Sequence, residues 1–250
     1  MLALDGKSGK LLWSKQLTPN DLYNMGSNAT GHDYDFGQPP ILVDLRNGKR
    51  ALVVGQKSGV VHALDPDRQG EILWQTRIGN GGPLGGIQWG SATDAANAYA
   101  ALSDLAMKGV PDKTAPQGYR LELDPNHGGG LFALQLTDGK TVWNAKPVGC
   151  GERKQCSPAQ SAPVTAIPGA VFSGSVYGHM RAYSTETGRV IWDMDTARDY
   201  DVVNGGKARG GSLDCAGPVI AGGVLYVTSG YGQWGGQPGN VLLAFSADGK

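Results

Sequence analysis

Hydrophobic residues occur along this chain in short runs, separated by turns rich in Gly, Asp and Pro. One series of runs covers 41–44, 51–55, 60–64 and 72–74, and another covers 163–166, 170–173, 179–183 and 190–192. Runs of this length suit strands and are too short for most helices. The pattern therefore predicts sets of four short antiparallel strands. No apolar run approaches the ~18 residues of a membrane span, so we expect none.

A segment with the order Ala, polar turn, Gly, Trp recurs along the chain. Its complete copies run 3–13, 63–74, 133–143 and 182–192; the second is one residue longer, and a fifth copy begins at Ala244 and reaches Lys250 without a Trp. Gly permits the left-handed backbone that a tight turn requires, and an aromatic at a fixed offset suits packing between adjacent units. Two further strands precede each copy. We therefore predict an all-β fold, a β-propeller with about four four-stranded blades.

The repeat boundaries predict one partial propeller domain over 1–250 that is open at both ends. We expect a blade remnant over 1–17 and blades over about 38–74, 86–143, 162–192 and 217–250, the last without its outer strand. Both ends of the sequence fall inside a repeat, whereas terminal repeats usually carry a cap. We therefore expect a longer protein, with closure into a small propeller as the alternative.

The stretch from Ala95 to Lys108 fits two structures. Its pattern is compatible with an amphipathic helix, but its place in the repeat favours a strand over 98–102. A long insertion would then run to Gly130.

Composition adds little about partners. Lys plus Arg is 22 and Asp plus Glu is 22, so the net charge is zero, and neither nucleic acid nor an anionic membrane is an expected partner. The 40 Gly residues agree with a chain of many turns. The first residues do not resemble a signal peptide.

Antiparallel blades alternate their connections between two faces. The short turns that hold the repeated Gly share one face, and the long loops share the other, which is the expected functional face. Asp33 and Asp35 precede an inner strand of this face, and Lys57 lies in a turn of the same blade. We expect all three near the propeller axis, where a carboxylate serves as a general base or metal ligand. Solvated turn residues are the plainer interpretation.

These segments resemble a known family. The chain is similar to segments of the pyrroloquinoline quinone (PQQ) alcohol dehydrogenases, the quinoproteins. The similar segments are the repeat, His32-Asp33-Tyr34-Asp35 before Pro40, Gln56-Lys57-Ser58-Gly59, and Gly85-Gly-Ile-Gln88-Trp89. Within that family the chain is most similar to the branch that oxidises polyvinyl alcohol.

The resemblance implies a mechanism and partners. Asp33 would take the alcohol proton as hydride moves to the quinone, while Lys57, Gln88 and Trp89 would contact PQQ. A calcium ion, or another divalent or lanthanide ion, would act as a Lewis acid, with Asp35 as a ligand. Cytochrome c would accept the electrons, and the enzyme would be periplasmic.

The sequence also departs from that family. The Glu and Asn metal ligands of the family come from blades that precede the catalytic Asp, and these blades are absent from this sequence, so we expect the chain alone to be inactive. The rival interpretation is a non-catalytic PQQ-like propeller that acts as a periplasmic scaffold or binding module.

Other residues with chemical potential lie in the long loops. Cys150 and Cys156 bracket a short loop that fits a disulfide of an exported protein; zinc is the less favoured alternative, because the loop offers only two ligand-type residues. Cys215 is expected to be a buried free thiol. Asp201 and Lys207 either meet substrate or belong to a solvated loop. The Gly-rich stretch 79–86 precedes no helix and is therefore not a phosphate loop.

Overall fold

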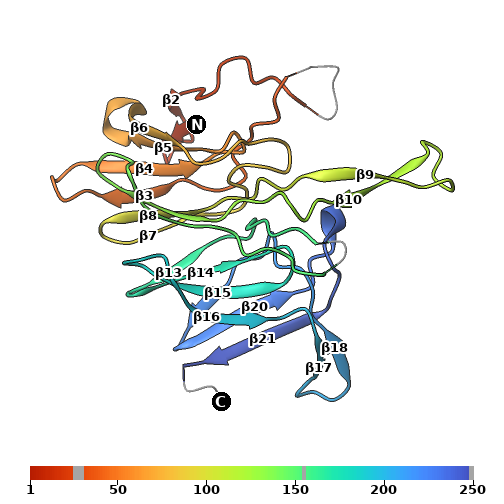
Figure 1. The fold of residues 1–250 in the computed structure, drawn as a ribbon. Helices are drawn as coiled ribbons and strands as arrows, with labels where there is room; N and C mark the ends of the chain where they lie inside the picture. Colours follow the sequence, from red (N-terminus) through yellow and green to blue (C-terminus); the bar gives the residue numbers. More distant parts are fainter. Residues whose placement is uncertain (25–30, 154–155, 248–250) are drawn as a thin grey trace.

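The computed structural model describes residues 1–24, 31–153 and 156–247, and it consists of strands, loops and two 3-10 turns (Figure 1). It confirms the all-β propeller fold. In these residues the antiparallel sheets follow one another along the chain without closing into a ring.

Three sheets have four strands in sequence order from the inner to the outer edge. Their strands are β3 (Ile41–Asp44), β4 (Arg50–Gly55), β5 (Val60–Asp65) and β6 (Glu71–Arg77) in the first; β7 (Ala92–Thr93), β8 (Asn97–Ala101), β11 (Leu131–Gln135) and β12 (Thr141–Ala145) in the second; and β13 (Thr165–Ile167), β14 (Ala170–Gly174), β15 (His179–Ser184) and β16 (Val190–Asp195) in the third. These sheets are called blades 2, 3 and 4 below.

Blades 1 and 5 are smaller. Blade 1 contains β1 (Leu2–Leu4) and β2 (Leu11–Ser14), and blade 5 contains β19 (Val219–Ala221), β20 (Val224–Ser229) and β21 (Val241–Ser246). The ambiguous stretch near Ala98 is strand β8, as its place in the repeat predicts, and not a helix.

Two hairpins stand outside the blades. Strands β9 (Met107–Pro111) and β10 (Tyr119–Leu123) lie in the insertion of blade 3, and β17 (Asp199–Asp201) and β18 (Lys207–Arg209) lie between blades 4 and 5. Both project on the same side of the molecule (Figure 1).

The repeated Ala and Trp are cross-strand partners. Ala63 pairs with Trp74, and the other copies pair in the same way: Ala3 with Trp13, Ala133 with Trp143 and Ala182 with Trp192. A register shift follows each Ala. The small side chain thus faces the large one at every copy. In blade 2 the 3-10 turn η1 (Pro66–Arg68) accommodates the extra residue.

Three of the repeated Trp residues, Trp13, Trp74 and Trp143, also pack on the Gly turn of the next blade. A Cβ added to Gly139 would lie 2.5 Å from the Trp74 ring, and one added to Gly188 would lie 2.6 Å from the Trp143 ring. The Trp74 indole donates to the Leu136 carbonyl at 2.9 Å. Gly is therefore required at these turns both for its left-handed φ and for its missing side chain.

The hydrophobic core lies between blades. One cluster joins blades 2 and 3 through residues such as Val53 and Ala98, a second joins blades 3 and 4, and a third joins blades 4 and 5. The short inner strand β7 contacts both β3 and β13, so the inner strands gather around a common axis.

The alternation of connections separates two faces, as predicted. The turns that hold Gly70, Gly139 and Gly188 lie on one face, called the plain face, and the linkers between blades lie on the other, called the loop face. Among the described residues there is no helix long and apolar enough to cross a membrane.

Candidate active site

The segment before β3 and the β4–β5 turn meet on the loop face. The Lys57 amide donates to the Asp35 carbonyl at 3.1 Å, so the backbones of the two segments are directly joined. This contact brings together the three charged side chains that the sequence places near the axis.

The Lys57 ammonium lies between two carboxylates. Its Nζ is 3.2 Å from both carboxylate oxygens of Asp33 and 3.0 Å from Asp35 Oδ2. The Lys57 and Asp33 side chains are 16% and 14% exposed, whereas the Asp35 side chain is 64% exposed. Asp33 and Lys57 thus form a sheltered ion pair, with Asp35 at its solvent side.

Different environments move the pKa values of the two carboxyls in opposite directions. Burial raises the pKa of Asp33, and the nearby Asp35 adds to this, although Lys57 opposes it. The hydrogen bond from Lys57 lowers the pKa of Asp35. Burial alone would lower the pKa of Lys57, but its hydrogen bonds to the two carboxylates outweigh burial and raise it. Asp33 is therefore the more basic carboxylate of the pair.

Gln88 and Trp89 lie against the same segment. A Cβ added to Gly37 would be 2.5 Å from the Gln88 carbonyl oxygen and 3.7 Å from the Trp89 ring. The Gln88 side chain is buried and donates to the Gly85 carbonyl. All five residues that the sequence assigns to the site thus come from neighbouring segments of the loop face.

The sequence did not indicate the role of Asp214. This carboxylate, 7% exposed, accepts hydrogen bonds from Trp89 Nε1 at 2.9 Å and Ser161 Oγ at 2.5 Å. Burial raises its pKa, against the effect of these two hydrogen bonds. The contact fixes the plane of the Trp89 indole from the linker that precedes blade 5, across 125 positions of sequence.

A cavity of about 340 Å³ opens beside the Lys57 turn, between the loop at Thr18 and blade 2. Gln56 and His62 line it, together with Tyr34. Burial lowers the pKa of His62 to about 4. A neutral ring that carries its hydrogen on Nε2 satisfies both neighbours, because Nε2 faces Gln56 Oε1 at 3.3 Å and Nδ1 faces Gln75 Nε2 at 2.8 Å. The Gln56 and His62 side chains therefore give this cavity a polar, uncharged surface, beside which Arg77 supplies a positive charge.

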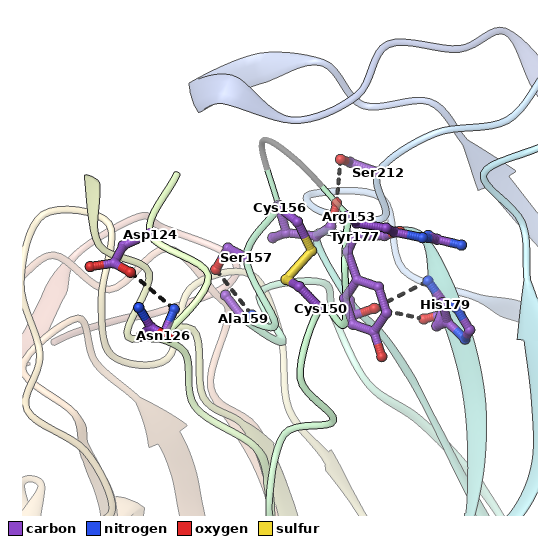
Figure 2. The surroundings of a disulfide bond; sticks show 12 residues. Asp124, Asn126, Cys150, Arg153, Cys156, Ser157, Ala159, Tyr177, His179 and Ser212 are labelled. Carbon is purple, nitrogen blue, oxygen red and sulfur yellow. Dashed lines mark hydrogen bonds between the residues drawn. A yellow bond between two sulfur atoms is a disulfide. The ribbon is translucent and has the colours of Figure 1, made fainter. Parts of the chain in front are cut away.

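Cys150 and Cys156 form a disulfide, as the sequence predicts and in preference to zinc (Figure 2). Figure 2 places Tyr177 and Arg153 beside it. Arg153 Nη1 donates to the Tyr177 carbonyl at 2.8 Å, and its guanidinium carbon is 5.8 Å from the Tyr177 ring centre. The disulfide loop is thus attached to the β14–β15 turn.

The other candidates lie apart from this cluster or differ from expectation. Cys215 is a free thiol but only half-buried, because it precedes β19 at the loop face; the expectation of a buried thiol was wrong. Asp201 and Lys207 face each other in the β17–β18 hairpin, 82% and 78% exposed, which suits a solvated loop. Across the described residues, no three His, Cys, Asp or Glu side chains are grouped as a metal site.

Comparison with known sequences agrees with this architecture. A family model described as outer membrane protein assembly factor BamB matches residues 1–178 and 127–250. The chain is 41% identical over 271 residues to a polyvinylalcohol dehydrogenase of a Pseudomonas species and 38% identical over 275 residues to one of Sphingopyxis sp. (strain 113P3). Both matches cover 100% of this chain and 40% of the relative, so the chain spans well under half the length of these proteins.

Solved structures share the fold at lower identity. The quinohemoprotein alcohol dehydrogenase of Comamonas testosteroni aligns with a TM-score of 0.63 at 19% identity, over 100% of this chain and 42% of that protein. A europium-containing methanol dehydrogenase aligns with a TM-score of 0.59 at 19% identity, over 92% of this chain and 44% of that protein. With the repeat, the blades and the family match in agreement, the chain belongs to the PQQ-repeat β-propeller family.

Proposed function

We propose that this chain forms part of a PQQ-dependent alcohol dehydrogenase that oxidises polyvinyl alcohol or a related secondary alcohol. The observation that carries the proposal is the sheltered pair of Asp33 and Lys57 on the loop face, in a segment that packs against Trp89 at Gly37. The two curated relatives support the choice of substrate class, because both are named for that activity.

The residues present suit an orthoquinone. Lys57 Nζ has three hydrogens, and two of them serve its carboxylates, so one remains for a carbonyl-type oxygen. Trp89 offers a flat ring whose orientation Asp214 fixes. PQQ, when bound, would accept the two electrons and the hydrogen of the alcohol carbon as a hydride.

Asp33 would act as the general base. Its raised pKa makes it a stronger proton acceptor than an exposed carboxylate, and Lys57 holds it in place from one side. It would remove the hydroxyl proton of the alcohol, while Gln88 and Trp89 would contact the cofactor.

The residues present fit a metal ion less well than they fit the quinone. Asp35 is the exposed carboxylate beside Lys57, and no cluster of three ligands surrounds it in the part of the chain that the structure describes. We propose Asp35 as one ligand of a calcium, other divalent or lanthanide ion, with the remaining ligands supplied by the cofactor or by residues outside this chain.

Electron acceptor and compartment are further parts of the proposal. A soluble cytochrome c would take the electrons, as the family resemblance implies. The Cys150–Cys156 disulfide suits an oxidising compartment, and we propose the periplasm.

Dye-linked oxidation of polyvinyl alcohol tests this function. The complete gene product is assayed with PQQ and calcium, as wild type, Asp33→Asn and Asp44→Asn. Asp44 is an exposed carboxylate at the plain-face end of β3 and serves as the matched control. We expect Asp33→Asn to lose about 10²–10⁴-fold in rate, and Asp44→Asn to keep the wild-type rate.

Two results would contradict the proposal. An Asp33→Asn enzyme as fast as wild type would exclude Asp33 as the base. A complete protein that binds no PQQ would exclude the dehydrogenase and favour the second candidate, a non-catalytic periplasmic scaffold or binding module, which the description of the matching family model supports.

A further inference from the structure

Asp104 has an unusual backbone conformation beside the site. It follows β8 at the start of the blade 3 insertion and has a φ of +39°, a region that most side-chain-bearing residues avoid and that Asp and Asn enter more often than the others. Such conformations persist where the surroundings hold them, often at functional sites. Here the surroundings are three backbone amides.

The Asp104 carboxylate closes a glycine-rich loop. Oδ2 accepts the amide of Asn80 at 2.8 Å, and Oδ1 accepts those of Gly81 at 3.1 Å and Gly86 at 3.0 Å. These donors lie at the two ends of one loop, residues 80–86. Charge-assisted bonds of this kind are stronger than bonds between neutral groups. One side chain therefore holds both ends of the loop together.

That loop lies on the backbone of the Lys57 turn. The Gly82 amide donates to the Lys57 carbonyl at 3.0 Å. A Cβ added to Gly86 would lie 2.1 Å from the same carbonyl oxygen, and one added to Gly81 would lie 2.5 Å from the Ser58 backbone. The backbones approach so closely that a shift of the loop must shift Lys57.

The loop also leads directly to the second part of the site. The Ile87 amide donates to the Gln56 carbonyl at 3.1 Å, and Gln88 and Trp89 follow. The position of Lys57 and the start of the Gln88–Trp89 segment thus both depend on the loop that Asp104 closes.

We propose that Asp104 is a positioning residue of the active site: by holding the loop 80–86 on the Lys57 backbone, it fixes where the Lys57 ammonium meets Asp33 and where Gln88 and Trp89 are presented. The expected effect of Asp104 on catalysis rests on the proposed function. The structural link from Asp104 to Lys57 does not.

Three substitutions separate the effect of losing the carboxylate from the effect of relieving the strained backbone. Asp104→Ala removes the acceptor, Asp104→Gly removes it while relieving the strained φ, and Asp104→Asn retains one oxygen and tolerates a left-handed backbone. The control is Asp94→Ala. Asp94 lies in the plain-face turn of the same blade, where it accepts the amides of Ala96 and Asn97, each at 2.7 Å.

Hydrogen exchange followed by mass spectrometry is the first readout. We expect Asp104→Gly and Asp104→Ala to speed exchange at least tenfold in peptides that cover 80–90 and 56–59, with Asp104→Asn between these variants and wild type. Asp94→Ala should leave both peptides unchanged. Unchanged exchange at 56–59 in Asp104→Gly would overturn the inference.

Binding of PQQ, measured by quenching of tryptophan fluorescence, is the second readout, on the complete gene product. We expect Asp104→Gly to weaken the affinity about tenfold and Asp94→Ala to preserve it. Equal affinity of Asp104→Gly and wild type would overturn the positioning role while leaving the dehydrogenase intact. If wild type binds no PQQ but exchange changes as expected, the proposed function fails and the link from Asp104 to Lys57 stands.

Discussion

Replacing Gly188 by Ala should cost much more stability than replacing Gly169 by Ala. Both glycines lie in plain-face turns of blade 4 and have left-handed backbones, with φ of +69° and +87°. A Cβ at Gly188 would lie 2.6 Å from the Trp143 ring, whereas a Cβ at Gly169 would meet no atom within 4 Å. The pair therefore isolates packing against Trp143 from backbone strain.

The magnitudes follow from these two contributions. A left-handed conformation costs an L-residue roughly 1–2 kcal/mol, which applies to both variants. Forcing a methyl into a close-packed contact adds about 1–3 kcal/mol, which applies only to Gly188→Ala. The lower entropy of the unfolded chain that Ala brings is the same in both. We expect the free energies of unfolding of the two variants to differ by about 1–3 kcal/mol.

Urea denaturation followed by circular dichroism measures the difference, and tryptophan emission gives a local signal. The Trp143 indole donates to the Thr185 carbonyl at 2.9 Å, so displacement of the ring in Gly188→Ala should also shift the emission maximum. Equal losses of stability in the two variants would refute the idea that the ring holds the next blade through its glycine.

Three more outcomes are expected. Burial lowers the pKa of His62 from an ordinary 6.5 to about 4, so its contribution to stability is complete above pH 6.5 and is lost as pH falls toward 4. Urea titrations at pH 4 should therefore show that wild type has lost about 3 kcal/mol more of its free energy of unfolding than His62→Gln, and equal losses would contradict this. Lys57→Met removes the group that opposes the rise in the pKa of Asp33, so carboxylate NMR should find that pKa higher still, and an unchanged value would show that the pair is not formed in solution. Replacing Cys150 and Cys156 together by Ser should lower the free energy of unfolding by about 2 kcal/mol in urea, and a variant as stable as wild type would show that the loop needs no cross-link.

Sequence periodicity was sufficient to predict the blades and the face of the molecule on which each loop lies. The Ala-to-Trp spacing is local, and it recurs because the same cross-strand pair forms in each sheet. Topology then placed Asp33 and Lys57 on one face, and the structure brings them within 3.2 Å. Their chemical roles remain predictions.

Long-range hydrogen bonds account for what the sequence did not reveal. Asp104 and Asp214 look like ordinary loop carboxylates, because their partners, the amides of residues 80–86 and the Trp89 indole, come from other segments. His62 looked like a scattered histidine, and its hydrogen-bond partners are Gln56 of the β4–β5 turn and Gln75 of β6. No local pattern marks these contacts.

The contact of Trp13, Trp74 and Trp143 with the glycine of the next blade also affects how this protein can diversify. The plain face thus joins neighbouring blades by a contact that does not involve the loops of the opposite face. Residues 102–130 of blade 3 occupy the place that residues 56–59 occupy in blade 2, yet Trp74 and Trp143 dock on the following turns in the same way. Connections on the loop face can therefore differ in length from blade to blade while the order of the blades is inherited unaltered.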